Sequence, residues 1–176
     1  ITEEVSRLVE DGTSLFLDVG STTNLIADAL QGHSGLSIAT NSVAVAFKLA
    51  MRNGNRVFFA GGELRPNDGG SFGPEALGFL QNFRLDLAVI STSGVCPRRG
   101  FLFSDLSEAQ LARTMLQNAA RRVVAADARK FHRTAPIALG DPQQIDVLVC
   151  DEEPPEEIRA AAKGWGTVIR VARPFP

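Results

Sequence analysis

The sequence predicts an α/β fold, with a mostly parallel sheet flanked by helices, and three observations support this prediction. Apolar runs of about five residues, typical of buried strands, alternate with stretches of about ten residues that have helical apolar spacing. The chain has 176 residues and 44% hydrophobic content, which is enough to bury one core. No internal repeat, linker or low-complexity tract divides it, so a single domain is expected.

The first half of the chain predicts two strand-then-helix units and a third strand. An opening helix ends at Gly12, which can turn the chain. The next predicted elements are strands at residues 15–19, 36–40 and 57–60, and helices at residues 22–30 and 43–50 after the first two strands. The apolar spacing places Leu25 and Leu30 on the buried face of the first of these helices. It places Val43 and Phe47 on the buried face of the second.

The second half predicts a helix, a strand and then a longer run of alternating elements. A polar, glycine-rich segment at residues 63–72 precedes a helix that begins at Pro74. A strand at residues 85–90 is followed by a long polar loop, and Ser107 then begins a helix that contains Ala119. The remaining predicted elements are strands at residues 123–126, 147–150 and 168–171, with a helix from Pro155 to about Gly164 before the last strand.

Composition excludes several classes of protein. The formal net charge of −2 lacks the basic surplus of a nucleic-acid binder, so any DNA contact must come from elsewhere. The two cysteines, Cys96 and Cys150, are too few for a disulfide framework or a metal cluster, and we expect neither a metal nor a cofactor. No apolar run approaches the roughly 18 residues that cross a bilayer, and no signal peptide is recognisable. We expect a cytoplasmic protein without membrane contact.

Candidate binding residues cluster directly after the predicted strands. In an open parallel sheet, ligands bind outside the carboxyl ends of the strands, so small polar groups and glycines at those positions indicate one polar crevice. Together with the acidic residue Glu108, the candidates are Asp18, Gly20, Ser21, Thr22, Thr23, Asn41, Ser42, Gly61, Gly62, Ser93, Gly94 and Lys130.

The turn at residues 20–23 combines three features that bind anions. Gly20 allows close backbone approach, the hydroxyls can donate, and a helix N-terminus offers free amides and a favourable dipole. These features suit a phosphate, although the hydroxyls could equally serve only to cap the helix. Lys130 could neutralise the same anion, or it could be an ordinary solvated lysine. The turn is not a Walker A sequence, because it lacks the Gly-Lys-Ser/Thr ending.

Two further features have more than one interpretation. Glu108 could be a general base, an acceptor for sugar hydroxyls, or a charge that favours the first turn of its helix. The polar segment at residues 63–72 could be a mobile lid over the crevice or a flexible surface loop.

Several ordered motifs resemble the C-terminal effector-sensing domain of the DeoR family of bacterial transcriptional repressors. The resemblance extends from Val5 to about Val171 and includes Gly100 and the acidic position Glu108. The motifs are LDVGSTT (residues 17–23), TNS (40–42), GGELRP (61–66), GP (73–74), ARRVV (120–124), DARKF (127–131) and RTA (133–135).

The resemblance implies a ribose-5-phosphate isomerase-like fold, the fold shared by NagB, RpiA and CoA transferases. It implies that residues 1–176 form a single effector-sensing domain for a phosphorylated sugar or related metabolite. It also implies homo-oligomers and a winged helix-turn-helix that binds operator DNA. We expect that DNA-binding domain to be absent from this chain and the sequence to be an excerpt from a longer protein, because it starts within a helical pattern at Ile1.

One departure from the isomerases favours a sensor over an enzyme. The isomerase-like relatives carry aspartates after the fourth strand, where this chain has STSG at residues 91–94. Sugar-phosphate isomerisation needs positioned acid and base groups, and Glu108 alone is more plausible as a hydrogen-bond acceptor. The alternatives are an aldose-ketose isomerase that acts through Glu108, and a domain that serves mainly for oligomerisation.

Overall fold

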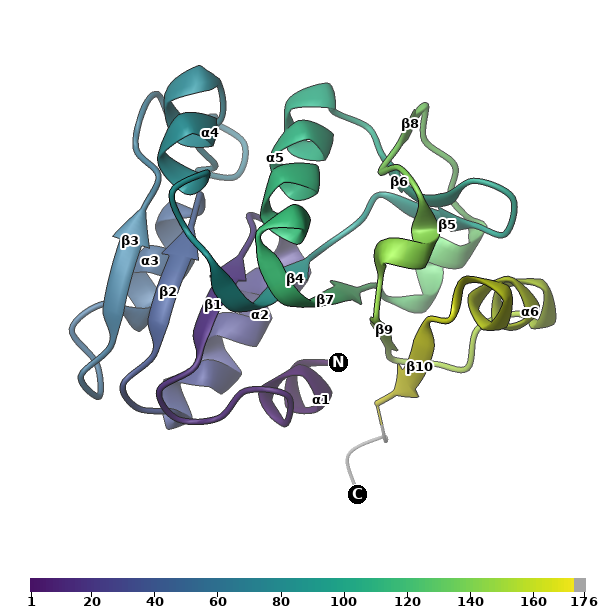
Figure 1. Ribbon diagram of the computed structural model, residues 1–176, viewed down its shortest axis with the longest axis horizontal. Helices are drawn as coiled ribbons and strands as arrows, with labels where there is room; N and C mark the ends of the chain where they lie inside the picture. The colour runs from purple at the N-terminus through teal and green to yellow at the C-terminus, as the bar shows by residue number, and fades with distance from the viewer. Residues whose placement is uncertain (173–176) are drawn as a thin grey trace.

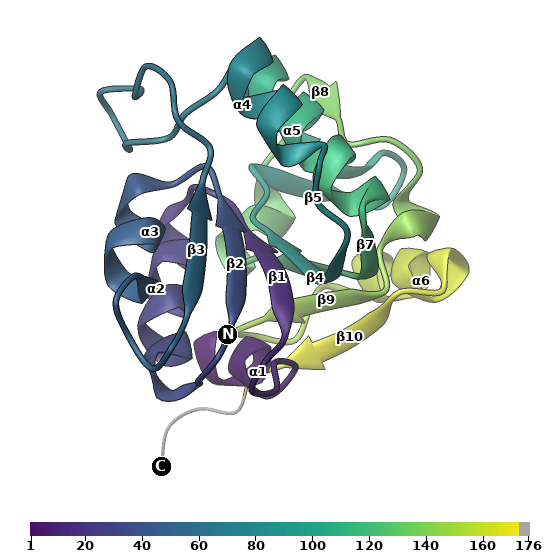
Figure 2. The same cartoon turned by 60° about the vertical axis from the view of Figure 1, so that its left-hand side comes forward.

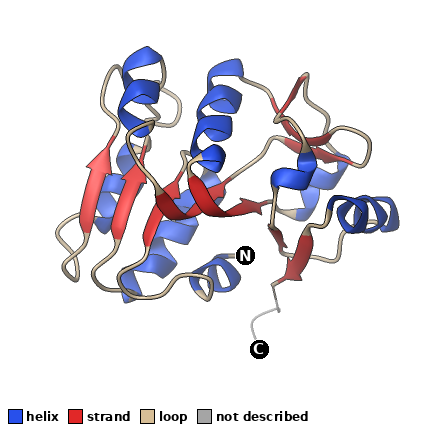
Figure 3. Cartoon of the chain, viewed as in Figure 1, coloured by secondary structure: helices blue, strands red, loops and turns tan. Residues whose placement is uncertain are grey.

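A computed structural model describes residues 1–172, which form a seven-stranded sheet and a small antiparallel sheet beside it (Figure 1, Figure 3). The large sheet has the order β10-β9-β7-β4-β1-β2-β3, and every neighbouring pair in it is parallel. Its strands are β1 (Ser14–Leu17), β2 (Ser37–Thr40), β3 (Arg56–Phe59), β4 (Leu85–Ile90), β7 (Ala119–Ala125), β9 (Val147–Cys150) and β10 (Val168–Val171). The predicted α/β class is confirmed.

Helices cover both faces of this sheet. They are α1 (Thr2–Ser6), α2 (Ser21–Ala29), α3 (Val43–Leu49), α4 (Pro74–Leu80), α5 (Leu106–Gln117) and α6 (Glu156–Trp165), together with short 3-10 turns that include η2 (Ala128–His132). None of the helices in residues 1–172 is long and apolar enough to cross a membrane.

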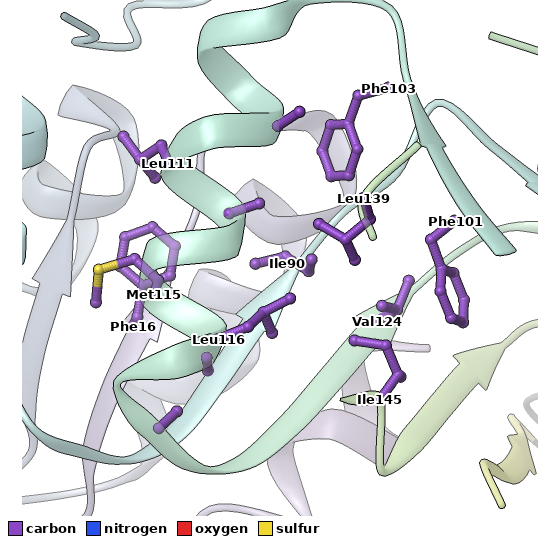
Figure 4. Close-up of a cluster of buried hydrophobic side chains, with 14 of the residues drawn as sticks. Phe16, Ile90, Phe101, Phe103, Leu111, Met115, Leu116, Val124, Leu139 and Ile145 are labelled. Atoms are coloured by element: carbon purple, nitrogen blue, oxygen red, sulfur yellow. The ribbon is translucent and has the colours of Figure 1, made fainter. Parts of the chain in front are cut away.

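The side chains of β1 show how the two faces are filled. Leu15 and Leu17 belong to the buried cluster on the side of α1, α2 and α3. Phe16, between them in sequence, belongs to the opposite cluster, because successive strand residues point to opposite faces. In that second cluster Phe16 lies with Met115 and Leu116 of α5 (Figure 4). The sheet is therefore buried on both faces, as its continuous apolar strands predict.

The prediction of a long polar loop after β4 is wrong in part. It contains two strands of the small sheet, β5 (Gly94–Cys96) and β6 (Gly100–Phe103), which are antiparallel, and β8 (Ile137–Ala138) pairs with β6. All four residues of β6 are buried, so the strand shows no polar alternation to reveal it. Ala119, expected in a helix, begins β7 and pairs with Leu85.

The expected buried face of α3 is also wrong. Val43 and Phe47 are 40% and 83% exposed, whereas Val45 and Leu49 are fully buried. In α2, Leu25 is likewise 57% exposed, although Leu30 beyond its end is buried as expected. Apolar residues occupy two sides of these helices, so periodicity alone could not select the side that packs on the sheet.

A long loop lies beyond the carboxyl ends of the strands of the large sheet. The carboxyl end of β3 leads into the loop that continues to α4, and Figure 2 shows this loop extending beyond the ends of the strands. We call residues 63–72 of this loop the strap. The starts of α2 and α3 follow β1 and β2 at the same edge, which is where ligands bind in open parallel sheets.

Candidate functional site

A cavity of about 160 Å³ opens at the carboxyl ends of the central strands. Elements far apart in sequence form its walls. The predicted residues Gly20, Ser21, Thr22, Ser93, Glu108 and Lys130 all line this cavity. The structure thus brings together residues from the start of α2, the segment after β4, α5 and η2.

The start of α2 presents uncapped backbone to this cavity. Gly20 is the N-cap residue, and no side chain among the described residues caps the helix. Capping is therefore not the role of the hydroxyls of Ser21 and Thr22, and the first amides of α2 are available to an anion. Thr23 is fully buried, and its hydroxyl donates to the carbonyl of Gly20 at 3.1 Å.

Glycine at position 20 is favoured by the neighbouring segment rather than by its φ angle. The φ of Gly20 is 169°, which is an extended conformation open to any residue. A Cβ there would lie 2.8 Å from the hydroxyl oxygen of Ser91 and 3.2 Å from that of Thr23. The close approach lets the turn after β1 pack against the turn after β4.

Asp18 also connects the turn after β1 to the turn after β4. Its side chain is only 7% exposed, and its Oδ2 accepts hydrogen bonds from the backbone amide of Ser91 at 2.9 Å and from the Ser91 hydroxyl at 3.1 Å. Burial raises the pKa of Asp18 to about 7, against the lowering effect of these bonds, and the nearby charge of Glu108 adds a small increase. The pKa of the Asp18 carboxyl group thus lies near neutral pH.

Asn41 and Ser42 hold the scaffold around the cavity. Asn41 accepts from the amide of Val19 at 3.1 Å and donates to the carbonyl of Ser71 at 3.2 Å, so it fastens the strap to the end of β1. Ser42 accepts from the amide of Val45 at 3.3 Å, which caps α3. Both side chains are buried, and their observed bonds are structural.

Three predicted glycines lie outside the cavity walls. Gly61 and Gly62 are exposed, and nothing lies within 4 Å of a Cβ built on either. Gly62 has φ 116°, so it serves the turn after β3. Gly94 packs against backbone, because a Cβ there would lie 2.3 Å from the carbonyl oxygen of Arg133.

The strap contributes Arg65, a residue not among the predicted site residues. Its guanidinium forms ion pairs with Asp68 and Glu108, and it lies 3.8 Å from a carboxylate oxygen of Asp105. The guanidinium carbon also lies 4.3 Å from the ring centroid of Phe72, a cation-π arrangement. The bond with Asp68 is the main cause that raises the pKa of Arg65 and lowers that of Asp68. Arg65 therefore ties the strap to the first turn of α5.

Sequence signals existed for only some of the missed residues. Arg65 is the one basic residue of the strap, but its partner Glu108 lies 43 positions away. Ser91 belongs to a polar run in which only geometry distinguishes the members. The hydroxyl of Thr92 bonds to the carbonyls of Gly94 and Leu102, whereas the hydroxyl of Ser91 donates to Asp18.

Replacing Arg65 with methionine is expected to loosen the strap. The backbone amides of residues 65, 69 and 70 donate within the strap at 2.8 to 3.0 Å, so their hydrogen exchange reports its opening. We expect exchange at these amides to accelerate at least about tenfold, because the ion pairs to α5 are lost. The control is Arg52→Met, an exposed arginine without an ion pair among residues 1–172. Equal exchange in both variants would contradict the role assigned to Arg65.

Comparison with known structures supports the fold assignment. The chain is similar to a D-ribose-5-phosphate isomerase solved with phospho-erythronic acid, with TM-score 0.52 and 18% identity over 74% of this chain and 51% of that one. It is also similar to a probable sor operon regulator from Shigella flexneri, with TM-score 0.55 and 13% identity over 91% of this chain and 83% of that one. The ribose-5-phosphate isomerase-like fold is confirmed.

Comparison with known sequences shows the family. The chain is 34% identical over 158 residues to the glycerol-3-phosphate regulon repressor of Escherichia coli (strain K12), covering 90% of this chain and 63% of that protein. It is 33% identical over 160 residues to the repressor CsqR of the same organism, covering 91% and 61%. The chain thus spans less than two thirds of these relatives. Residues 1–152 match the family model described as the DeoR C terminal sensor domain, and the chain belongs to that family.

Proposed function

We propose that this chain is the effector-sensing part of a transcriptional repressor and that it binds a phosphorylated sugar or related metabolite. The observation that carries the proposal is the uncapped start of α2 at the wall of a polar cavity. Free helix amides, the hydroxyls of Ser21 and Thr22, and the ammonium group of Lys130, a partly buried residue, are complementary to a phosphate group.

Names of relatives support a phosphorylated ligand. One relative is called a glycerol-3-phosphate regulon repressor, and one structural neighbour was solved with phospho-erythronic acid. The cavity of about 160 Å³ is below the usual size of drug-like pockets, so it suits a small phosphorylated molecule.

Binding at the phosphate cradle can be tested by removing its donors. In a calorimetric screen of phosphorylated sugars, we expect the double variant Ser21→Ala, Lys130→Ala to bind the best ligand at least about tenfold more weakly, since two charge-assisted contacts are lost. Lys163→Ala removes an exposed lysine of α6 as a matched control and should leave affinity unchanged. If no phosphorylated metabolite binds, or if the double variant binds as tightly as the wild type, the proposed cradle is wrong.

An aldose-ketose isomerase is the second candidate function. The observation in its favour is a buried carboxyl, Asp18, with a pKa of about 7, whose charge interacts with Glu108. Against it, the segment after β4 contributes only hydroxyls from Ser91, Thr92 and Ser93, and Arg65 already pairs with Glu108. An assay of aldose-to-ketose conversion separates the two functions. Turnover that disappears in Glu108→Gln would favour the isomerase.

The regulator as a whole would connect this site to DNA. We propose that ligand binding changes the affinity of a helix-turn-helix domain for operator DNA, in a cytoplasmic homo-oligomer. Symmetric repressors commonly bind symmetric operators, which favours an oligomer. The change requires that the ligand bind two states of the protein unequally, so operator binding with and without the ligand is the measurement.

A further inference from the structure

Asp18 has one oxygen whose hydrogen bonding the protein does not satisfy. Oδ2 accepts from the amide and the hydroxyl of Ser91, whereas Oδ1 is buried and has no hydrogen-bond partner among residues 1–172. The hydroxyl of Thr23 lies close enough to this carboxyl to lower its pKa, but the hydrogen bond that the hydroxyl donates goes to the carbonyl of Gly20 at 3.1 Å. A buried carboxylate oxygen without a donor is costly, so this atom points to a group that is not part of the protein.

Asp18 lines a second, inner pocket of about 10 Å³, room for about one hydroxyl-sized group. The inner pocket shares Val19, Phe103 and Glu108 with the larger cavity, so the two adjoin. Asn41, which also borders the inner pocket, has its amide oxygen and nitrogen bonded to Val19 and Ser71. A ligand in the larger cavity can therefore extend one small group toward Asp18.

The two ends of the combined cavity have opposite electrostatic character. The outer end has the helix amides, Ser21, Thr22 and Lys130, which favour an anion. Asp68 and Glu108 also line this end, but Arg65 forms ion pairs with both carboxylates. The inner end is lined by the carboxyl groups of Asp18 and Glu108 and by the apolar rings of Phe72 and Phe103. Carboxylates accept hydrogen bonds from hydroxyl groups and repel anions, so the inner end complements a neutral group that donates.

We propose that Asp18 is a specificity-determining residue that accepts a hydrogen bond from an effector hydroxyl at the inner end of the combined cavity. Asp18 and Glu108 together then select phosphorylated polyols and sugars over ligands that carry a carboxylate or a second phosphate at that end. The inference rests on the proposed function, because it assumes that the phosphate occupies the start of α2.

Matched ligand pairs test this selection. One pair is glycerol 3-phosphate and 3-phosphoglycerate, and the other is fructose 1-phosphate and fructose 1,6-bisphosphate. Each pair keeps one phosphate and replaces a distal hydroxyl-bearing group with an anionic one. By calorimetry at pH 8, above the pKa of about 7 for Asp18, the wild-type chain should prefer the first member of at least one pair by about tenfold or more, because a second anion would face two carboxyl groups. In Asp18→Asn this preference should fall below about threefold.

Asp105→Asn is the matched control for charge. It removes one carboxylate near the site but keeps a good N-cap for α5, and Asp105 does not line the inner pocket. We expect this variant to keep the wild-type preference. Loss of preference in both variants would indicate a general charge effect and overturn the role of Asp18.

The remaining outcomes separate this inference from the proposed function. If both members of each pair bind equally well to the wild type, the selection by Asp18 is wrong, whereas the phosphate cradle stands. If Asp18→Asn alters the stability of the chain but leaves the preference intact, Asp18 is only a structural link to Ser91. If no phosphorylated compound binds the wild type, the proposed function fails and this inference fails with it.

Discussion

Gly94→Ala is expected to destabilise the chain by about 3 kcal/mol or more. The added Cβ would lie 2.3 Å from the carbonyl oxygen of Arg133 and 3.0 Å from its carbonyl carbon. Both atoms are backbone, so no side-chain rotation relieves the clash. Gly94 also begins β5 and pairs with Leu102 of β6, which prevents it from moving away without loss of the small sheet. Urea denaturation, followed by circular dichroism, measures the effect.

Gly61→Ala provides the control for this prediction. Gly61 is exposed, and a Cβ there meets no atom within 4 Å, so its replacement should change stability by less than about 0.5 kcal/mol. Sequence reasoning grouped Gly61 and Gly94 as binding residues. A Gly94→Ala variant that keeps wild-type stability but loses ligand binding would show that the packing role assigned here is incorrect.

Asp18→Asn is expected to make the chain more stable at pH 8 than the wild type, and this advantage should shrink at lower pH. The folded pKa of Asp18 is about 7, raised from an ordinary value of 3.8. Between these values the folded state binds a proton that the unfolded state has lost, so wild-type stability falls as pH rises through this window. The difference between the two pKa values corresponds to about 4 kcal/mol over the whole window, and asparagine removes this dependence on pH.

Stability measurements at pH 5 and pH 8 check this prediction. The difference in unfolding free energy between Asp18→Asn and the wild type should increase by about 2 kcal/mol or more from pH 5 to pH 8. Asp86→Asn is the control, because hydrogen bonds from Ser14 lower the pKa of Asp86. The stability that ionised Asp86 contributes is present above pH 4 and is lost only in stronger acid. The difference in unfolding free energy between Asp86→Asn and the wild type should therefore stay constant from pH 5 to pH 8. A constant difference for Asp18→Asn would refute the raised pKa.

Much of the fold follows from patterns along the chain. Buried parallel strands are continuous apolar runs, and all seven strands of the large sheet were expected near their observed positions. The small sheet was missed because β8 has two residues and β6 is buried throughout, so neither shows an alternating pattern. The prediction of the buried face of α3 was wrong because Phe47 and Leu49 are both apolar, and only packing on the sheet distinguishes them.

In the candidate site, too, sequence predicted some residues correctly and missed the role of others. Residue type and position after a strand were enough to select Gly20, Ser21, Thr22 and Lys130, which all line the cavity. The same rule also selected Gly94, which packs against Arg133 instead. Glycines at strand ends serve turns, close packing and ligands alike, so their type does not indicate which role applies.

Local sequence was sufficient for the class of fold and for a polar crevice at one edge of the sheet, because strand ends and helix starts are defined by neighbouring residues. The selectivity that we propose for that crevice depends on pairs of residues that only folding brings together. Asp18 meets Ser91 across 73 positions, and Arg65 meets Glu108 across 43. Hydrogen bonds and desolvation act over a few ångströms in space, so which oxygen of Asp18 is left without a donor cannot be deduced from the order of residues.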